Sequence, residues 1–287
     1  MNKDLRFCTA LVTPYTEKGI DYKNLAYLID RQLEGGVSSI LVNGTTAEPS
    51  LLTEEEKWDQ IRFVIDYIGG KVPVMVGCGT VSTEKTIENC KKAEDMGADY
   101  LLIVTPYYNK TNQDGVAEHY IKIAEKANKP IIMYNVPART GFDLLPQTVI
   151  RLSTYKMISG IKQASPDISR CIEMFPALSE SFCLLCGDDC MVLPMMSVGA
   201  SGLVSVVSNV CPKLVNKVLQ NKEPLDFYTL KKMSDLCFCE TNPIPVKYIM
   251  FKLGLLSEYY LRLPLYSLSA ENKAKIDKFL PVIKEQL

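Results

Sequence analysis

One lysine in this sequence stands where it could act as a nucleophile. Lys162 ends the apolar segment Ile158-Ser159-Gly160-Ile161-Lys162, whose composition predicts a buried strand. Most lysines are solvated surface charges. At the end of a buried strand, however, the ammonium form is disfavoured and the neutral amine becomes accessible. Such an amine forms Schiff bases with carbonyl compounds, so the segment predicts an enzyme that forms an imine through Lys162.

Proton transfer in such chemistry needs groups other than histidine. The only histidine, His119, lies in an amphipathic stretch far upstream of Lys162. Tyr134 and Tyr108 each follow an apolar run, where their hydroxyls could pass protons along a chain that includes Thr45. A tyrosine at such a position is otherwise an ordinary core or rim residue.

Two further features could bind carboxylates. Arg139 follows the apolar run that contains Tyr134, and its planar guanidinium could bind a substrate carboxylate with two hydrogen bonds. The alternative for Arg139 is a surface ion pair. The segment Gly44-Thr45-Thr46 leaves backbone N–H groups free before a helix N-terminus, which suits an anion.

The elements that must position these residues alternate regularly along the chain. Short runs rich in Val, Ile and Leu predict strands buried on both faces of a parallel sheet. Helical spacing fills most of the gaps, and the pair Thr53 and Glu56 forms the pattern of a helix-opening capping box. Eight strand–helix alternations predict an α/β fold, a (β/α)8 TIM barrel, with its chemistry at the carboxyl ends of the strands. The predicted strands are residues 7–13, 39–43, 74–77, 100–105, 131–135, 157–162, 182–186 and 202–205.

The strand pattern ends near Leu219, and the remainder predicts helices with one link broken at Leu263-Pro264. We therefore divide the chain into a barrel catalytic domain, residues 1–222, and a C-terminal helical region, residues 223–287. No low-complexity linker separates them.

Composition narrows the classes of partner. The 287 residues carry 32 basic and 33 acidic side chains without a basic tract, which argues against nucleic acid or an anionic membrane as a partner. No window resembles a membrane span or an export signal, so we expect a soluble, cytoplasmic protein.

The ten cysteines lie mostly in apolar runs, where free cysteine packs as a small hydrophobe. Cys183, Cys186 and Cys190 are close in sequence, but a structural zinc site would need a fourth ligand. We expect packing there, and neither a metal nor a cofactor.

Taken together, the strand ends resemble those of the dihydrodipicolinate synthase/N-acetylneuraminate lyase family of pyruvate-dependent class I aldolases. The matching segments follow one another along nearly the whole chain. They are Gly44-Thr45-Thr46-x-Glu48, Thr105-Pro106-Tyr107-Tyr108, Tyr134-Asn135-Val136-Pro137-x-Arg139-Thr140-Gly141, Gly160-Ile161-Lys162, Gly187-Asp188-Asp189, Gly202-x-x-Ser205, Asn242-Pro243-Ile244-Pro245-Val246-Lys247 and Leu261-Arg262-Leu263-Pro264.

The resemblance implies a (β/α)8 barrel with C-terminal helices that self-associates into homodimers or homotetramers. Within the family, Arg139 and the segment from Asn242 to Lys247 follow the synthase pattern. The implied lyase reaction condenses pyruvate with L-aspartate semialdehyde to 4-hydroxy-tetrahydrodipicolinate, in lysine and diaminopimelate biosynthesis. The alternatives are another pyruvate-dependent aldolase of the family, such as an N-acetylneuraminate lyase or a keto-sugar-acid aldolase, and a non-catalytic ligand-binding barrel.

The resemblance also implies roles for individual residues. Lys162 would form the imine, and a partner subunit would supply Tyr108 across the dimer interface. The implied proton relay is Tyr134, Thr45 and Tyr108. The implied substrate-binding residues are Thr46 for the pyruvate carboxylate, Arg139 for the semialdehyde carboxylate, Val204 and Gly187.

One position departs from the family pattern. Ala47 follows the two threonines where the family has glycine. If that turn needs a positive φ, the Cβ of Ala47 would cost roughly 1 kcal/mol and could shift the threonine groups.

Regulation by the end product lysine is not expected. Lysine-sensitive members bind lysine at the dimer interface, through polar and acidic residues beside the first tyrosine of the pair at 107–108. The corresponding positions here are Val81, Lys85, Glu54 and Lys57. Because Lys85 would face a cationic ligand with a like charge, we predict that lysine does not inhibit.

Overall fold

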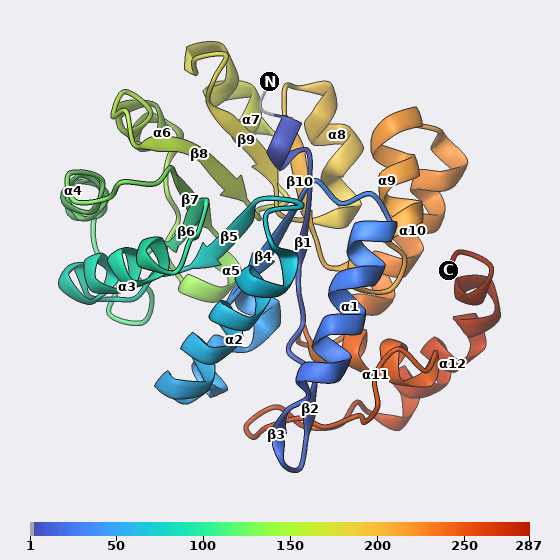
Figure 1. Cartoon of the computed structure of the whole chain (residues 1–287). Coiled ribbons are helices and arrows are strands. Elements are labelled where there is room, and N and C mark those ends of the chain that lie inside the picture. Colours follow the sequence, from blue (N-terminus) through green and yellow to red (C-terminus); the bar gives the residue numbers. More distant parts are fainter. Residues whose placement is uncertain (1–2) are drawn as a thin grey trace. The chain divides into compact units, whose positions relative to one another are not determined.

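The computed structural model describes residues 3–287, and its central element is a closed barrel of eight strands (Figure 1). Their order around the barrel is β1-β10-β9-β8-β7-β6-β5-β4. The predicted TIM barrel is therefore confirmed, and each predicted run overlaps one barrel strand. The strands are β1 (Phe7–Ala10), β4 (Ser39–Val42), β5 (Val74–Gly77), β6 (Tyr100–Val104), β7 (Ile131–Asn135), β8 (Ile158–Gln163), β9 (Cys183–Cys186) and β10 (Gly202–Ser205).

The barrel strands are short, and each is buried along almost its whole length. All residues of β1, β4, β7, β9 and β10 are buried. Parallel pairing brings residues of neighbouring strands into register, for example Val104 with Tyr134 and Tyr134 with Lys162. Continuous apolar composition is what such doubly covered strands require.

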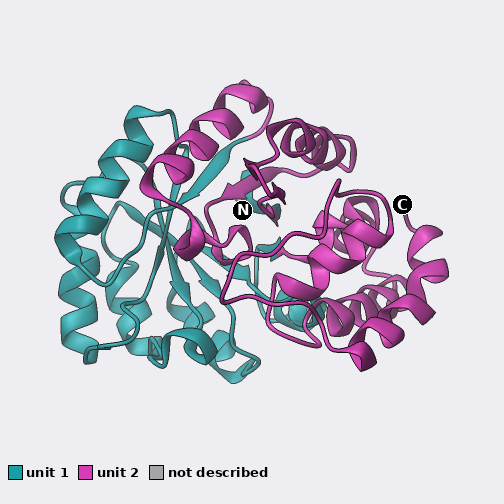
Figure 2. Cartoon of the chain, turned by 90° about the horizontal axis from the view of Figure 1, so that it is seen from below, with its two compact units in different colours: residues 1–8, 73–204 teal, residues 9–72, 205–287 magenta. Residues whose placement is uncertain are grey.

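The chain forms two compact units that are interleaved along the sequence (Figure 2). Unit 1 contains residues 1–8 and 73–204, and unit 2 contains residues 9–72 and 205–287. Neither unit ends at the predicted domain boundary between residues 222 and 223, which remains a prediction.

Unit 1 contains strands β5 to β9, most of β10, and helices that lie along the outside of these strands (Figure 2). Ser82 caps α3 by accepting a hydrogen bond from the backbone N–H of Lys85, and Asn112 caps α4 in the same way through Gly115. Its helices are α3 (Thr83–Asp95), α4 (Gln113–Ala124), α5 (Pro137–Thr140), α6 (Pro146–Leu152), α7 (Ser169–Met174) and α8 (Val192–Ser197), with 3-10 turns η1 (Lys3–Leu5), η4 (Phe175–Ala177) and η5 (Asp189–Met191).

Unit 2 contains the first two long helices and the C-terminal helices. The predicted capping box at Thr53 and Glu56 is confirmed, since both of its hydrogen bonds are present. A small hairpin of β2 (Tyr15–Thr16) and β3 (Gly19–Ile20) was not predicted. The helices are α1 (Tyr22–Glu34), α2 (Glu54–Ile68), α9 (Pro212–Asn221), α10 (Pro224–Cys237), α11 (Ile244–Lys252) and α12 (Ala270–Lys284), with 3-10 turns η2 (Thr45–Ala47), η3 (Pro49–Leu51) and η6 (Val207–Asn209).

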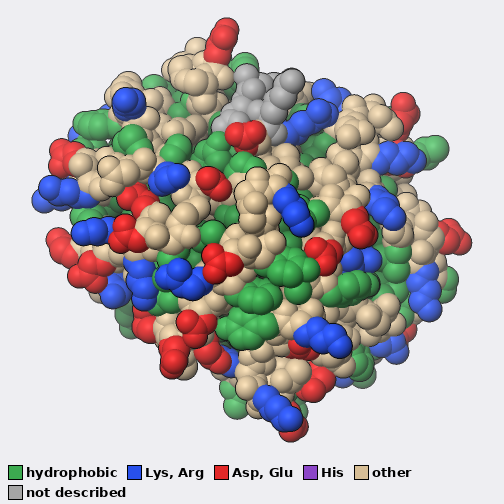
Figure 3. Space-filling view, viewed as in Figure 1, with side chains coloured by type: hydrophobic (Ala, Val, Ile, Leu, Met, Phe, Trp, Pro, Cys, Tyr) green, Lys and Arg blue, Asp and Glu red, His purple; other side chains and the backbone are tan. Residues whose placement is uncertain are grey.

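The surface carries both signs of charge. Lysine and arginine side chains alternate with aspartate and glutamate over the face shown in Figure 3, and neither sign forms a large field there. Among the described residues, no helix combines the length and apolar character needed to cross a membrane.

Candidate active site

Lys162 and Tyr134 lie side by side at the carboxyl ends of neighbouring strands in unit 1. Lys162 is on β8 and Tyr134 on β7, and their Cα atoms are register partners. The Nζ of Lys162 lies 4.3 Å from the centroid of the Tyr134 ring. Both side chains are buried, with 4% and 6% of their surface exposed. The structure therefore brings together the predicted nucleophile and one member of the predicted proton relay.

Among residues 3–287, the Lys162 amine has no acidic partner. The amine forms neither an ion pair nor a hydrogen bond there, and its close neighbour is the Tyr134 ring. A buried ammonium is costly unless a carboxylate compensates it. Within the described residues, the Lys162 amine therefore has no ion-pair partner of the kind that a structural lysine has.

Gly187 gives the Lys162 side chain the space it occupies. Gly187 follows β9, and a Cβ at this position would lie 3.0 Å from the Cε of Lys162 and 2.8 Å from the Cβ of Ala164. Both distances are shorter than side chains tolerate without moving. The structure thus places Gly187, which the sequence assigned to substrate binding, directly against the predicted nucleophile.

A hydrogen-bonded network fixes the segment that follows Tyr134. Asn135 donates from Nδ2 to Asp143 Oδ1 at 3.0 Å and to Gln163 Oε1 at 3.2 Å. Its Oδ1 accepts from the backbone N–H of Leu144 at 3.0 Å. Asp143 in turn forms an ion pair with Arg170. Together these bonds hold both ends of the short helix α5.

Arg139 lies on α5, within the segment that this network encloses. Its side chain is exposed, which suits a group that receives a substrate from solvent. The helix ends at Gly141 in a left-handed conformation with φ +65°. The structure therefore places Arg139 on a turn directly after the strand that carries Tyr134.

Two other predicted residues belong to unit 1, Tyr108 and Val204. Tyr108 lies in the loop after β6 with φ +64° and is 88% exposed. Tyr107 beside it is 41% exposed. Among the described residues, Tyr108 has no hydrogen bond or ring contact. Val204 is buried on β10.

Thr45 and Thr46 belong to unit 2, in a segment that we call the threonine loop, residues 44–48. Thr45 to Ala47 form one 3-10 turn, closed by hydrogen bonds from Ala47 N to Gly44 O and from Glu48 N to Thr45 O. The positive φ of the loop falls on Glu48, at +59°, and Ala47 is not among the residues with positive φ. The condition for strain at Ala47, a positive φ, is therefore not met, and the 3-10 turn accommodates alanine.

Side chains from elsewhere in unit 2 hold the threonine loop. Asn242 donates from Nδ2 to Thr46 Oγ1 at 3.0 Å. Thr13 donates from Oγ1 to the carbonyl oxygen of Ala47 at 2.7 Å. In contrast, the Thr45 hydroxyl has no hydrogen bond within residues 3–287, and Thr45 is only half-buried. Thr45 thus keeps a hydroxyl available for a ligand.

A buried ion pair lies at the end of this loop. Lys247, on α11, pairs with the carboxylate of Glu48, and each side chain is 1% exposed. Burial raises the pKa of Glu48, while the charge of Lys247 lowers it. Burial lowers the pKa of Lys247, while the charge of Glu48 raises it. The two groups therefore depend on each other to remain charged.

Aromatic and basic side chains surround the pair. The Nζ of Lys247 lies 4.2 Å from the centroid of the Tyr15 ring, and the Cζ of Arg262 lies 4.4 Å from the same centroid. Arg262 also pairs with Glu56, and its hydrogen bond holds the pKa of that carboxyl at about 2. The C-terminal region thus contacts the threonine loop through Lys247, and the neighbouring helix α2 through Arg262.

Sequence reasoning gave Glu48, Lys247 and Asn242 no role, although all three lie in the segments that carry the family resemblance. A signal was present, because Lys247 interrupts the apolar run from Ile244 to Met250. A charged residue in such a run predicts a buried partner. The sequence does not show that this partner is Glu48.

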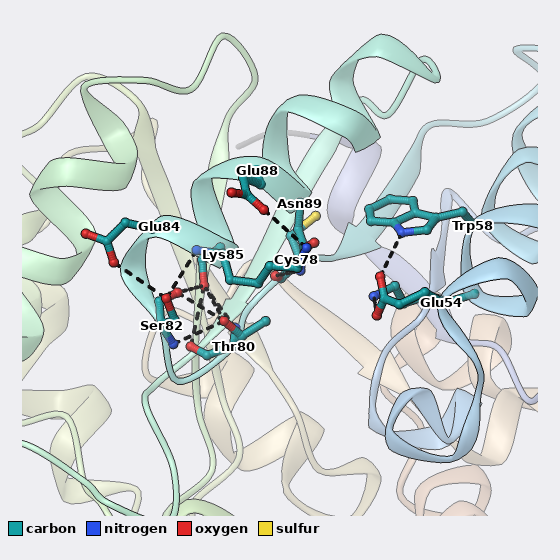
Figure 4. A network of polar contacts seen from close by, with 11 residues as sticks. Glu54, Trp58, Cys78, Thr80, Ser82, Glu84, Lys85, Glu88 and Asn89 are labelled. Atoms are coloured by element: carbon teal, nitrogen blue, oxygen red, sulfur yellow. Dashed lines mark hydrogen bonds and ion pairs between the residues drawn. The ribbon is translucent and has the colours of Figure 1, made fainter.

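The residues considered for lysine binding form local networks in each unit (Figure 4). In unit 1, Lys85 Nζ lies 3.1 Å from Glu88 Oε2, beside the hydrogen-bonded turn around Ser82, and Val81 is 48% exposed. In unit 2, Glu54 accepts hydrogen bonds from Lys57 Nζ at 2.5 Å and from Trp58 Nε1 at 3.2 Å. Both lysines thus already have carboxylate partners.

Comparison with known proteins gives consistent similarities over the whole chain. A profile of the dihydrodipicolinate synthetase family matches residues 3–283. A 4-hydroxy-tetrahydrodipicolinate synthase from Sulfurihydrogenibium sp. is 39% identical over 94% of this chain and 95% of its own. Dihydrodipicolinate synthase from Aquifex aeolicus superimposes with a TM-score of 0.95 at 36% identity, over 99% of each chain. The chloride-inhibited enzyme from Acinetobacter baumannii, complexed with pyruvate, has a TM-score of 0.93 at 36% identity, over 99% of this chain and 100% of its own.

Proposed function

Since the chain belongs to the dihydrodipicolinate synthetase family, we propose that it condenses pyruvate with L-aspartate semialdehyde to 4-hydroxy-tetrahydrodipicolinate through an imine on Lys162. The observation that carries the assignment of Lys162 is its environment. Its amine is buried, lies 4.3 Å from the centre of the Tyr134 ring and has no carboxylate partner among residues 3–287. An amine in such a setting is suited to attack a carbonyl carbon.

The chemistry follows from the properties of an imine. The Lys162 nitrogen attacks the ketone carbon of pyruvate, and loss of water gives the imine. A proton then leaves the methyl carbon, and the resulting enamine attacks the aldehyde carbon of the second substrate, whose oxygen takes up a proton. The amino group of that substrate next attacks the imine carbon, which closes the ring and releases the Lys162 amine.

The remaining assignments of the proposal follow from position and chemistry. Tyr134 is the proton carrier nearest Lys162, in a relay with Thr45 and with Tyr108 from a second subunit. The exposed position of Tyr108 in the single chain supports a role at a subunit interface. The threonine loop holds the pyruvate carboxylate through Thr46 and its backbone. Arg139 holds the semialdehyde carboxylate, while Val204 and Gly187 line the pocket.

The same proposal includes a homodimer or homotetramer in the cytoplasm, acting in lysine and diaminopimelate biosynthesis. All ten cysteines are free, and most of them are buried. Reduced cysteines are the rule in the reducing environment of the cytoplasm.

A trapping experiment tests the nucleophile. The protein is incubated with pyruvate, reduced with borohydride and analysed by intact mass and peptide mapping. We expect one pyruvate adduct, on Lys162, and none in Lys162→Met, whose fold is checked by circular dichroism. An adduct on another lysine contradicts the assignment. A normal adduct without condensation of aspartate semialdehyde would instead point to a different aldehyde substrate.

A further inference from the structure

The ion pair of Glu48 and Lys247 is unusually well buried for a pair that joins a turn to a helix. Both side chains are 1% exposed, whereas the other ion pairs of the described chain involve side chains that are at least 11% exposed. Taking two charges out of water offsets most of their mutual attraction, and apolar residues of similar volume often serve stability as well or better. The pair therefore calls for an explanation other than stability.

The backbone conformation of Glu48 supplies such an explanation. Glu48 is the residue at which the threonine loop leaves its 3-10 turn, and it does so with φ +59°, a conformation that favours glycine. Its N–H donates to the carbonyl oxygen of Thr45 and its carbonyl oxygen accepts from the N–H of Leu51. A side chain fixed on Lys247 holds this residue in the left-handed conformation and thereby fixes the end of the turn.

Within residues 3–287, the polar contacts that hold the threonine loop leave one side-chain hydroxyl without a partner. Thr46 is held through its hydroxyl by Asn242, Ala47 through its carbonyl oxygen by Thr13, and Glu48 through its carboxylate by Lys247. Among the side-chain groups of the loop, only the Thr45 hydroxyl has no partner within residues 3–287. Two of these three attachments, those from Asn242 and Lys247, come from the C-terminal region.

From this arrangement we infer that Glu48, Lys247 and Asn242 are positioning residues, through which the C-terminal region holds the threonine loop in the geometry that binds the pyruvate carboxylate. The inference rests on the proposed function, because it takes the ligand of the loop to be that carboxylate. None of the three residues needs to touch the substrate. Their effect is to fix the Thr45 hydroxyl and the loop N–H groups before pyruvate arrives, which reduces the ordering required on binding.

The test removes both charges together, so that no unpaired buried charge is left. The variant is Glu48→Gln/Lys247→Met. A matched control makes the same two changes on the exposed surface of α12, as Glu271→Gln/Lys275→Met, where the original pair is 2.8 Å apart. For each protein, unfolding in urea gives stability, and borohydride trapping gives the pyruvate concentration for half-maximal adduct. Steady-state kinetics then separate kcat from KM.

We expect the buried double variant to need at least ten times more pyruvate for half-maximal trapping than the control. At saturating pyruvate the adduct should still form completely on Lys162. A purely structural role would instead lower stability or the active fraction and leave the half-saturating concentration unchanged. A folded double variant within twofold of the control in that concentration would overturn the inference.

A second variant decides the matter if the double variant does not fold. Asn242→Leu removes the donor to Thr46 Oγ1 without changing any charge, and it should raise the half-saturating pyruvate concentration at least fivefold. An unchanged concentration there would count against the inference. Absence of any adduct in the wild-type protein would be a different result, because it would remove the proposed function itself.

Discussion

Lys162 and Lys247 are both buried lysines whose amines lie close to a tyrosine ring, but their electrostatic environments differ. The Nζ-to-centroid distance is 4.3 Å for Lys162 with Tyr134 and 4.2 Å for Lys247 with Tyr15. Within residues 3–287, Lys247 has a carboxylate partner, that of Glu48, and Lys162 has none. The aromatic contact therefore does not distinguish the two, and the presence or absence of the anion does.

This difference indicates how one fold can use the same side chain in two ways. An ion-paired lysine can fix the backbone of a neighbouring element. A buried lysine without an ion-pair partner leaves its amine available to react with a carbonyl compound. Burial alone is thus a poor guide to catalysis, and the nearest counter-charge is the better one.

The largest contrast should appear when each lysine is replaced by methionine. Lys247→Met leaves the Glu48 carboxylate buried without a partner and should lower the free energy of unfolding by about 3–5 kcal/mol. Lys162→Met removes no ion pair, so its stability should stay within about 1 kcal/mol of wild type while pyruvate trapping is lost. Urea unfolding of both variants measures this. Equal losses of stability would break the distinction between the two lysines.

A second contrast separates the substrates. Arg139→Ala removes a charge-assisted contact of about 3 kcal/mol, so kcat/KM for aspartate semialdehyde should fall about a hundredfold or more with pyruvate trapping nearly intact. Thr46→Val should have the opposite selectivity, raising the KM for pyruvate by about tenfold. Initial rates with each substrate varied in turn provide the measurement. If Arg139→Ala weakens pyruvate binding equally, the assignment of Arg139 is wrong.

Acid titration should distinguish the two units by the pH at which each loses stability. In unit 1, burial lowers the pKa of His119 from 6.5 to about 4. The unfolded chain therefore binds the proton first, and stability falls as the pH drops from about 6.5 to 4, by up to about 3 kcal/mol. In unit 2, the lowered pKa of Glu56, at about 2, makes its contribution disappear only as the pH drops below 4.5.

The variant His119→Phe isolates the first of these windows. His119 Nδ1 shares a hydrogen bond with Thr83 Oγ1, but within the described chain its Nε2 has no partner, so a phenylalanine should fit at modest cost. The difference in unfolding free energy between wild type and variant should change between pH 6.5 and 4 and stay constant above pH 7. A constant difference across the whole range would show that His119 does not titrate as its burial implies.

The smallest expected effect is that of lysine. Lys85 and Lys57 already have carboxylate partners, Glu88 and Glu54, and their charges oppose a cationic ligand. Initial rates should be unchanged by lysine up to about 10 mM, with calorimetry in parallel. Half-inhibition below about 1 mM, which corresponds to about 4 kcal/mol of binding free energy, would contradict the prediction.

The barrel was predictable because its strands are buried on both faces and so appear as short apolar runs. Lys162 and Tyr134 were predictable for the same reason, since each polar residue ends such a run, and parallel pairing then brings the two together. The hairpin β2–β3 was not, because two residues on each side leave no periodicity to detect. Whether Ala47 is strained could not be predicted, because the sequence does not show which residue of a turn adopts positive φ.

The polar contacts that hold the threonine loop could not be predicted from the sequence, for a different reason. Glu48 and Lys247 are each visible as charges in apolar surroundings, but a pairing between distant segments depends on the folded backbone. The hydrogen bond from Asn242 to Thr46 spans 196 residues of sequence. No local rule connects positions so far apart.

Contacts between residues so far apart in the sequence also affect the order in which parts of the protein can fold during synthesis. Unit 1 consists of residues 1–8 and 73–204, so all its parts have been translated by residue 204. The bonds of unit 2 from Val12 to Asn209, from Thr46 to Asn242 and from Glu56 to Arg262 join segments 197, 196 and 206 residues apart. Contacts between segments so far apart in the sequence form late, because the chain between them must first be synthesised and the loop that it forms must then be closed. The threonine loop is therefore among the first segments to be synthesised and among the last to acquire its final shape.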